Sequence, residues 1–360
     1  MKIGVISSYA CVQVSNNYGA LLQYFALQCY LLRRGHEPYW IRSVLPQSSL
    51  RLFARHMKNY QSLRLVGAFY KCHKAFEDFQ RRYLSVSYRE YHGNDDLCKD
   101  CPLADFYITG SDQVWGADLK ENYLRFVTDH KKKIAYAASF GRDQIDSIQM
   151  ATITPWIRDF AHVSVREASG VDICRSMGVD ALHLLDPTLL IDADAYPREK
   201  SSGRKNFLAC YFLNVTDIRS IRLDEIRKYA VDEELESLIM SCQYSECFFN
   251  KSELAMPSPE EWLRNYHDAK CIVTNTFHGT VFAIIFRKPF VTILQSGASS
   301  KQNTRILSLL EMFGLQERKW GGGDSELADV MAKPINWLDV ESRLEAYRRN
   351  TDRFFQNIGL

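Results

Sequence analysis

Short, continuously apolar runs recur along the chain, and each is followed by a polar loop and a helical pattern. The first run, Ile3–Ser8, does not alternate with polar residues, which is typical of a strand buried on both faces of a parallel sheet. A helical pattern covers Ala20–Arg33, Gly35 supplies a stop, and Pro38–Arg42 is predicted to form the next strand. This order of strand, helix and strand indicates the start of a doubly wound α/β sheet.

The strand pattern occurs in two series, which predicts two domains in a chain of 360 residues. The first domain is expected over residues 1–192, with a helical excursion at about 50–92, and the second over residues 206–336. A polar stretch with Pro and Gly, Asp192–Lys205, is the expected linker. The last segment, 337–360, is predicted to be a helix that could pack back on the first domain. The expected fold class is α/β, with two Rossmann-like domains in a GT-B-like arrangement and a site in the cleft between them.

Composition narrows the functional classes. Hydrophobic residues make up 46% and charged residues 24% of the chain, and the formal net charge is +2. These values are typical of a globular protein and exclude a strongly basic nucleic-acid footprint. The N-terminus lacks the pattern of a signal peptide, and the apolar run Thr280–Phe286 is far shorter than a membrane span. A soluble, cytoplasmic protein is expected.

Ten cysteines are scattered along the chain rather than arranged as a disulfide framework. Cys98 and Cys101 have the spacing of half a zinc or iron–sulfur site, but no second such pair follows. We therefore expect no metal and no cofactor, and an ordinary surface loop at this pair. A redox-linked or non-enzymatic role for the two thiols is the weaker alternative.

Polar segments follow several of the predicted strands, where α/β folds bind ligands. The loop at Asn17 and Gly19 enters a helix and could present backbone N–H groups to a phosphate or carboxylate, or form a plain turn. In the next segment Gly110 allows a sharp turn, and Ser111 and Asp112 could cap a helix or contact a ligand. Capping alone leaves Gln113 and Trp115 without a role, which favours a ligand site.

Two further strand ends carry charges. Arg166 ends an apolar strand and could grip a carboxylate or phosphate, or pair within the protein with Glu167 or Asp186. For Asp186 a structural role is favoured, either orienting Arg166 or capping a helix that starts at Pro187.

The segment Thr274–Thr280 is the strongest site candidate, because it closes a buried strand and opens an apolar helix. His278 is expected in the first turn and facing the cleft, where its imidazole could act as a base or bind an anion. Thr276 and Gly279 beside it indicate an open polar pocket rather than a packed core.

Taken in order, these segments resemble the polysaccharide pyruvyl transferase family over nearly the whole chain. The most specific matches are Gly110–Asp112, Val165–Glu167, Asp186–Thr188 and Phe277–Gly279. The resemblance implies a GT-B-like fold and transfer of pyruvate from phosphoenolpyruvate, a co-substrate, to a sugar diol of a surface polysaccharide or its lipid-linked precursor. The products would be a cyclic pyruvate ketal and phosphate.

The resemblance also implies roles for single residues. The family's strand-end arginine falls on Arg166, which would bind phosphoenolpyruvate, and its histidine falls on His278. Some members have an arginine two residues before that histidine, where this chain has Thr276, and Arg305 is the candidate replacement. The family's Asn-x-Gly-Asp segment is present only as Asn17–Ala20, without the acid.

The implied mechanism protonates the methylene of phosphoenolpyruvate while a sugar hydroxyl attacks the enol carbon. Arg166 and Arg305 would hold the donor, and His278 would bind phosphate or shuttle a proton. Asp112 or Glu167 could take the sugar proton, and Trp115 could stack on the sugar ring.

A GT-B glycosyltransferase with a nucleotide-sugar donor is the alternative, because it would have the same fold. No nucleic-acid partner is expected. A lipid-linked acceptor leaves peripheral association with the inner face of the membrane open.

Overall fold

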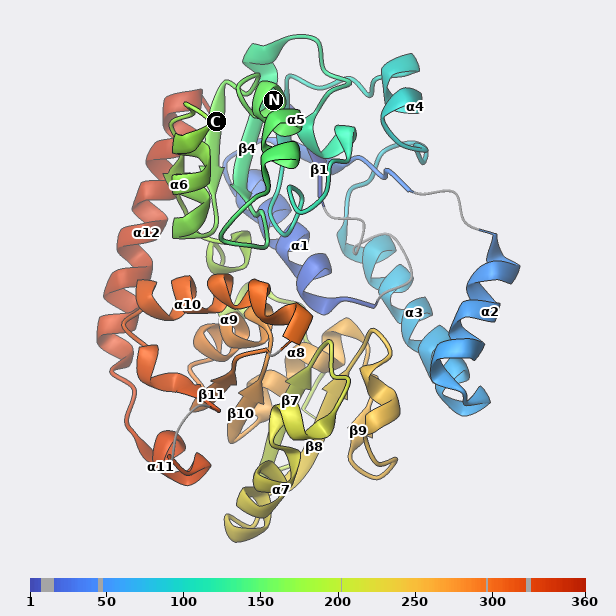
Figure 1. Ribbon diagram of the computed structural model, residues 1–360, viewed down its shortest axis with the longest axis vertical. Helices are drawn as coiled ribbons and strands as arrows, with labels where there is room; N and C mark the ends of the chain where they lie inside the picture. The colour runs from blue at the N-terminus through green and yellow to red at the C-terminus, as the bar shows by residue number, and fades with distance from the viewer. Residues whose placement is uncertain (8–15, 45–47, 202, 296, 322–324) are drawn as a thin grey trace.

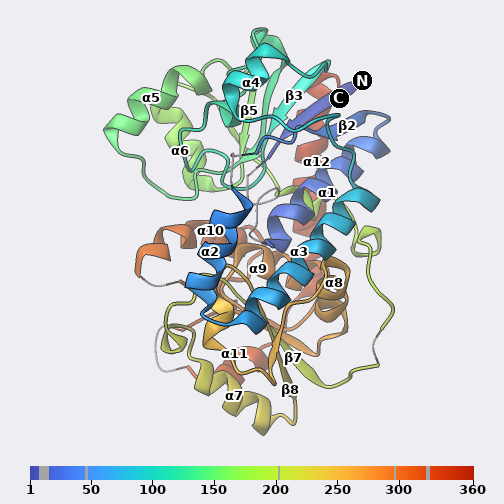
Figure 2. The ribbon, with the colours of Figure 1, turned by 90° about the vertical axis from the view of Figure 1, so that its right-hand side faces the viewer.

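The computed structural model describes the chain except residues 8–15, 45–47, 202, 296 and 322–324, and except the side chains of residues 298 and 299. Two parallel six-stranded sheets form two domains, one above the other in Figures 1 and 2. Both have the doubly wound character expected from the two series of apolar runs. The last strand of the first sheet ends at His183 and the first strand of the second begins at Phe207, so the predicted linker lies between the sheets.

The first sheet has the strand order β2-β1-β3-β4-β5-β6. Its strands are β1 (Lys2–Ile6), β2 (Glu37–Trp40), β3 (Phe106–Thr109), β4 (Lys133–Ala138), β5 (His162–Val165) and β6 (Leu182–His183). Alternate residues of β4 face opposite layers: Ile134 and Tyr136 pack with α1 (Tyr18–Arg33), whereas Ala135 packs with α5 (Ser147–Ile157) and α6 (Ala168–Ser176). Both faces are covered, which explains the continuously apolar strands.

The second sheet has the order β12-β11-β10-β7-β8-β9. Its strands are β7 (Phe207–Phe212), β8 (Glu236–Ser241), β9 (Leu254–Ala255), β10 (Cys271–Thr274), β11 (Phe290–Ile293) and β12 (Lys319–Trp320). One face packs on α8 (Pro259–Asp268), α9 (Phe277–Ile285) and α10 (Asn303–Met312), and the other on α7 (Leu223–Asp232) and α11 (Leu327–Ala332). The sequence predicted four of these strands and missed β9 and β12, which have two residues each.

Predicted boundaries differ from the structure by one or two residues in several places, because capping residues set them. The first helix begins at Tyr18 rather than Ala20, since Asn17 caps it by accepting a hydrogen bond from the Ala20 amide. β1 ends at Ile6, and the predicted last strand residue, Ser8, lies outside the described residues. The helical excursion consists of the antiparallel pair α2 (Ser49–Tyr60) and α3 (Leu63–Tyr83), followed by the short α4 (Asn94–Lys99).

A hydrophobic core runs without interruption from the first domain into the second. The Tyr18 ring at the start of α1 stacks on Trp262 of α8 at 5.3 Å, and its hydroxyl donates to the Pro257 carbonyl at 2.7 Å. Tyr196 of the linker packs on Phe282 of α9 at 5.1 Å. Because these large apolar contacts are fully buried, the cleft between the domains has a fixed floor.

The last helix, α12 (Trp337–Ile358), returns to the first domain and runs along one side of both (Figure 1). Asp352 accepts hydrogen bonds from Tyr30 of α1 at 2.7 Å and from Arg34, the residue just after α1, at 2.9 Å. Phe355 is fully buried between Tyr30 and Tyr136. These contacts attach α12 to the first domain.

None of the helices in the described part of the chain combines the length and the apolar character needed to cross a bilayer.

Replacing Phe355 by Ala should destabilise the protein by about 3–5 kcal/mol, because a fully buried ring is removed and a cavity remains. The matched control is Leu338→Ala on the same helix, where the side chain is 81% exposed and a change within about 0.5 kcal/mol is expected. Urea unfolding followed by fluorescence measures both. Equal effects of the two substitutions would show that α12 is not anchored through its buried face.

Candidate active site

A cavity of about 250 Å³ opens between the two domains, at the carboxyl ends of strands from both sheets. The first domain contributes the loops after β1 and β3, and the second contributes the loops after β7, β8, β10 and β11 together with the start of α10. The lining residues are Asn17, Asp112, Gln113, Tyr211, Leu213, Asn214, Gln243, Thr276, Phe277, His278, Gln295, Gln302 and Arg305. The site therefore lies in the cleft predicted from the sequence.

A single carboxylate, that of Asp186, connects the segments behind this cavity. Its Oδ2 accepts hydrogen bonds from Ser111 Oγ at 2.9 Å and from Arg166 Nη1 at 2.8 Å. Its Oδ1 accepts from the backbone N–H and the hydroxyl of Thr188, so that Asp186 caps the turn that follows. His278 Nε2 lies 3.6 Å from Oδ2, within ion-pair distance. Burial acts to raise the pKa of Asp186, but the neighbouring His278 and Arg166 outweigh it and hold the pKa well below its usual range.

Arg166 is buried against three carboxylates. Besides Asp186, Glu167 Oε1 lies 3.2 Å from Nε and Asp112 Oδ1 lies 3.7 Å from Nη2. The guanidinium carbon also lies 4.3 Å from the centre of the Phe277 ring. Burial acts to lower the pKa of Arg166, and the carboxylates, Glu167 first, raise it above its usual value. Arg166 does not line the cavity, so the structure gives it the internal ion-pair role that the sequence had kept as an alternative.

His278 occupies the first turn of α9 and is 8% exposed at the cavity. Thr276 caps this helix by accepting a hydrogen bond from the Gly279 N–H at 2.9 Å. The imidazole packs directly against Gly19 in the first turn of α1, where a Cβ would collide with His278 Nδ1. The N-terminal ends of α1 and α9 thus meet at the cavity, and each contributes a partial positive charge there.

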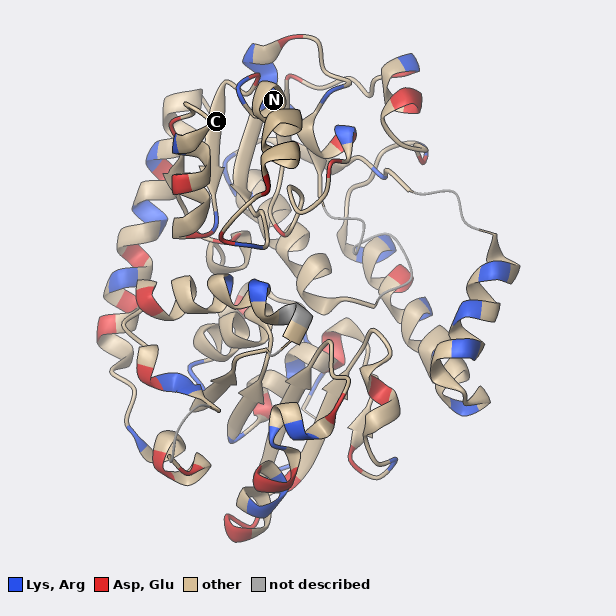
Figure 3. Ribbon diagram, viewed as in Figure 1, with Lys and Arg blue, Asp and Glu red and all other residues tan. Residues whose placement is uncertain are grey.

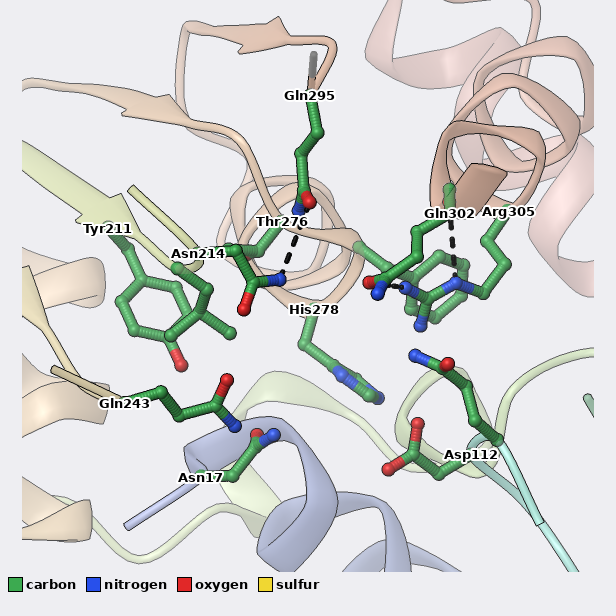
Figure 4. A pocket seen from close by; sticks show the side chains of 13 residues that line it. Asn17, Asp112, Tyr211, Asn214, Gln243, Thr276, His278, Gln295, Gln302 and Arg305 are labelled. Carbon is green, nitrogen blue, oxygen red and sulfur yellow. Dashed lines mark hydrogen bonds between the residues drawn. The ribbon is translucent and has the colours of Figure 1, made fainter. Parts of the chain in front are cut away.

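Arg305 is the one Lys or Arg side chain among the described residues that line the cavity. Its Nη2 donates to Gln302 Oε1 at 2.8 Å, and with the Gln113 amide turned to match, Gln113 Oε1 accepts from both Nη1 and Nη2. Among the described residues no carboxylate lies within ion-pair distance of it. Burial, and then the nearby charge of Arg166, lower the pKa of Arg305 to about 10, so the guanidinium is still charged at neutral pH. In Figure 4 it lies across the cavity from Gln243, with His278 between them.

Five of the residues predicted from the sequence line the cavity: Asn17, Asp112, Thr276, His278 and Arg305. The others lie behind it. Glu167 and Ser111 hold Arg166 and Asp186, and Gly19 makes room for His278. A Cβ at Gly110 would collide with the Tyr136 carbonyl, and one at Gly279 with the hydroxyls of Thr274 and Thr276. Sequence order alone could not separate the residues that line the cavity from those behind it.

The predicted role of Trp115 in stacking on a sugar is wrong. Its ring is 1% exposed and fills the core of the first domain, where it stacks on Tyr123 and contacts Phe140 and Phe160. The turn after Asp112 directs this side chain away from the cavity. Trp115 therefore stabilises the loop that carries Asp112 and does not contact a ligand in the cavity.

The sequence reasoning missed most of the amide side chains in the site. Asn214, Gln243 and Gln295 follow β7, β8 and β11, and Gln302 precedes α10. Their signal was positional, because each of the first three comes just after the carboxyl end of a parallel strand. Asn and Gln occur widely in loops, so residue type did not distinguish them.

The cysteine pair is remote from this site. Cys98 is exposed and accepts from Asn94 Nδ2, whereas Cys101 Sγ lies 3.4 Å from the Tyr107 hydroxyl. Within the described ranges, no three His, Cys, Asp or Glu side chains cluster as metal ligands would.

Comparison with known proteins identifies the family. The family model for polysaccharide pyruvyl transferase matches residues 17–297, which include every cavity-lining residue except Gln302 and Arg305. The chain belongs to the polysaccharide pyruvyl transferase family. No curated protein matches the chain significantly.

Solved structures with low sequence identity confirm the fold of this pyruvyl transferase family member. The UDP-GlcNAc 2-epimerase of Methanocaldococcus jannaschii superposes with a TM-score of 0.53 at 10% identity, over 96% of this chain and 99% of that one. An α-glucosyltransferase in complex with UDP gives a TM-score of 0.51 at 7% identity, over 99% and 95% of the two chains. The two-domain GT-B-like architecture is thereby confirmed, and family membership makes the chain a transferase of polysaccharide pyruvylation.

The contact between Gly19 and His278 can be tested by substitution. Gly19→Ala should destabilise the protein by about 1–3 kcal/mol, because the added methyl group must displace the imidazole. In Gly67→Ala, on α3, nothing lies within 4 Å of the new Cβ, so this control should stabilise by about 0.5–1 kcal/mol through helix propensity. The Tm of each variant, measured by thermal melting and compared with that of wild type, tests both expectations. A raised Tm for Gly19→Ala would contradict the close packing at His278.

Proposed function

We propose that this transferase moves pyruvate from phosphoenolpyruvate to two hydroxyls of one sugar, forming a cyclic ketal and releasing phosphate. The observation that supports this donor most directly is the environment of Arg305. A buried guanidinium that faces the cavity and is held by neutral amides has its charge available for an anion. Phosphoenolpyruvate has two anionic groups, a carboxylate and a phosphate.

The surroundings of Arg305 fit a small anion. The first turns of α1 and α9 direct the positive ends of two helices toward the same cavity. Two carboxylates that would repel an anion, those of Glu167 and Asp186, lie behind the cavity, where the charge of Arg166 partly offsets theirs. Arg166 thus acts through its neighbours and is a positioning residue, and direct contact with the donor falls to Arg305.

The proposed reaction balances as follows. A proton adds to the methylene carbon of phosphoenolpyruvate and makes it a methyl group, while one sugar hydroxyl forms a C–O bond to the enol carbon. The second hydroxyl forms the other C–O bond as the bond to phosphate oxygen breaks. Two hydroxyl protons are released. One returns to the enzyme group that protonated the methylene carbon, and the other leaves with phosphate.

Two side chains at the cavity are suited to these proton transfers. His278 lies between the Arg305 side and the Gln243 side, where it can hold phosphate or deliver a proton to the methylene carbon (Figure 4). Asp112 also lines the cavity, whereas Glu167 lies behind it, so Asp112 is the proposed base for the sugar hydroxyl. His278→Ala should abolish turnover, which phosphate release in the presence of acceptor would measure.

The donor can be tested before the acceptor is known. At a hundred times its Kd, phosphoenolpyruvate should stabilise the native protein by about 2.7 kcal/mol, which raises the Tm. Arg305→Met should remove this shift, because the guanidinium is lost while the apolar stem remains. The control Arg175→Met removes a 72% exposed arginine side chain on α6 and should keep the shift. A Tm raised by a nucleotide sugar and not by phosphoenolpyruvate would replace the proposed donor and favour a glycosyltransferase.

We also propose that the protein works at an anionic membrane surface, the place where a lipid-linked acceptor would be found. Residues 49–76, which span α2 and most of α3, hold six of the 45 Lys and Arg residues and none of the 43 Asp and Glu residues. Arg51, Arg55 and Lys58 follow one face of α2, beside Leu50, which is 78% exposed. Figure 3 shows α2 extending from the body with basic residues and no acidic ones. A basic helix face with exposed apolar residues is typical of a helix that lies on a membrane.

This surface can be tested by co-sedimentation with vesicles of phosphatidylcholine alone or mixed with phosphatidylglycerol. Binding is expected only to the mixed vesicles and should be lost in the triple variant Arg51→Glu, Arg55→Glu, Lys58→Glu, since each cation contributes roughly 1 kcal/mol near an anionic surface. The control reverses three exposed arginines of α12, Arg343, Arg349 and Arg353, and should bind like wild type. Absent binding, or equal loss in the control, would refute α2 as the docking surface.

A further inference from the structure

A second, larger cavity of about 680 Å³ adjoins the site and shares two of its lining residues, Asn214 and Gln243. One wall is the turn between α2 and α3, and the other is formed by the loops after β7 and β8. The complete lining is Asn59, Tyr60, Gln61, Asn214, Val215, Thr216, Gln243, Tyr244, Cys247 and Phe248. We call this cavity the side groove.

Eight of the ten lining residues of the side groove have amide, hydroxyl or aromatic side chains, and the other two are Val215 and Cys247. None of the ten described lining residues is Lys, Arg, His, Asp or Glu. Amide groups can donate to and accept from sugar hydroxyls, and aromatic rings pack on the apolar faces of sugars. A phosphate or nucleotide would meet no opposite charge here. The groove is therefore suited to an uncharged carbohydrate.

The walls of the side groove are joined at their base, so the cavity is a built feature of the fold. The Tyr60 hydroxyl at the end of α2 donates to Glu246 Oε1 at 2.9 Å, and the Tyr60 ring lies 5.0 Å from that of Tyr244. Cys247 Sγ lies 3.6 Å from the Asn59 carbonyl oxygen. Glu246 is 1% exposed, and its burial raises its pKa to about 7. These contacts attach the helical excursion of the first domain to the second domain.

The position of the groove separates it from the proposed donor side. Figure 4 shows Asn214, Gln243 and Tyr211 on one side of His278, and Arg305 and Gln302 on the other. A ligand that enters from the groove would reach His278 from the side opposite Arg305. That approach brings a sugar hydroxyl and an anionic donor to the same imidazole without competition for one subsite.

We infer that the side groove binds the acceptor: an uncharged oligosaccharide whose terminal sugar passes Asn214 and Gln243 into the site while the preceding sugars lie along the α2–α3 turn. This inference rests on the proposed function, because only that function makes the bound glycan an acceptor. Binding of the glycan itself does not depend on the donor. Aromatic and amide residues of the groove, rather than charges, hold the chain. The acceptor is thus expected to be recognised over more than one sugar.

The test is binding of the whole protein, without any donor, to an array of immobilised uncharged oligosaccharides of one to six hexoses. Two variants change exposed groove residues and leave the core intact: Phe248→Ala removes a 42% exposed ring, and Thr216→Trp fills the groove. Each should weaken glycan binding by about tenfold or more. Tyr88→Ala, which removes a 73% exposed ring outside the groove, should have no effect.

The outcomes separate this inference from the proposed donor. Binding of at least one multi-sugar glycan, weakened by both groove variants and retained by Arg305→Met, supports the groove as the acceptor site. Binding that both groove variants leave unchanged, or retention of no uncharged glycan by wild type, overturns it. Because the array contains no donor, failure of phosphoenolpyruvate to raise the Tm would refute the proposed function without changing the array result.

Discussion

The site depends on the buried carboxylate of Asp186. It receives hydrogen bonds from the loop after β3, from the end of β5 and from its own turn, and it lies against His278 of the other domain. With this charge removed, the buried Arg166 would lose its closest partner, which is strongly unfavourable in a dry environment. The same carboxylate therefore holds the loop of Asp112 and the guanidinium of Arg166 in place, and it lies beside the His278 imidazole.

Charge is distributed in two layers in this cleft. Behind the cavity, the carboxylates of Glu167 and Asp186 share the single positive charge of Arg166. At the cavity itself, six of the thirteen lining residues are neutral amides, and Arg305 is the one Lys or Arg among the lining residues that the structure describes. The α2–α3 hairpin adds a third element, because its outer face is basic and its turn forms a wall of the side groove. If α2 lies on a membrane, a glycan carried by a lipid would leave the bilayer next to that wall, a short path from the site.

The sequence predicted the fold well because buried parallel strands leave continuous apolar runs, and the missed strands β9 and β12 are too short to do so. The sequence also predicted that His278, Asp112 and Arg305 belong to one site, since each follows a recognisable strand or helix boundary. The sequence could not show which of the site residues line the cavity and which lie behind it. Whether Trp115 enters the cleft or the core depends on the path of one turn, and whether Arg166 contacts a ligand or three carboxylates depends on which strand ends are neighbours.

The return of α12 to the first domain has a consequence for the nascent chain. During synthesis, the face of the first domain that carries Tyr30 and Tyr136 remains uncovered while the entire second domain emerges, because Phe354 and Phe355 follow every strand of both sheets. An N-terminal domain commonly folds as a unit as it leaves the ribosome, but this one must wait for its last partner. Its apolar face is thus exposed until α12 has been synthesised, and transiently exposed apolar surface of this kind favours aggregation.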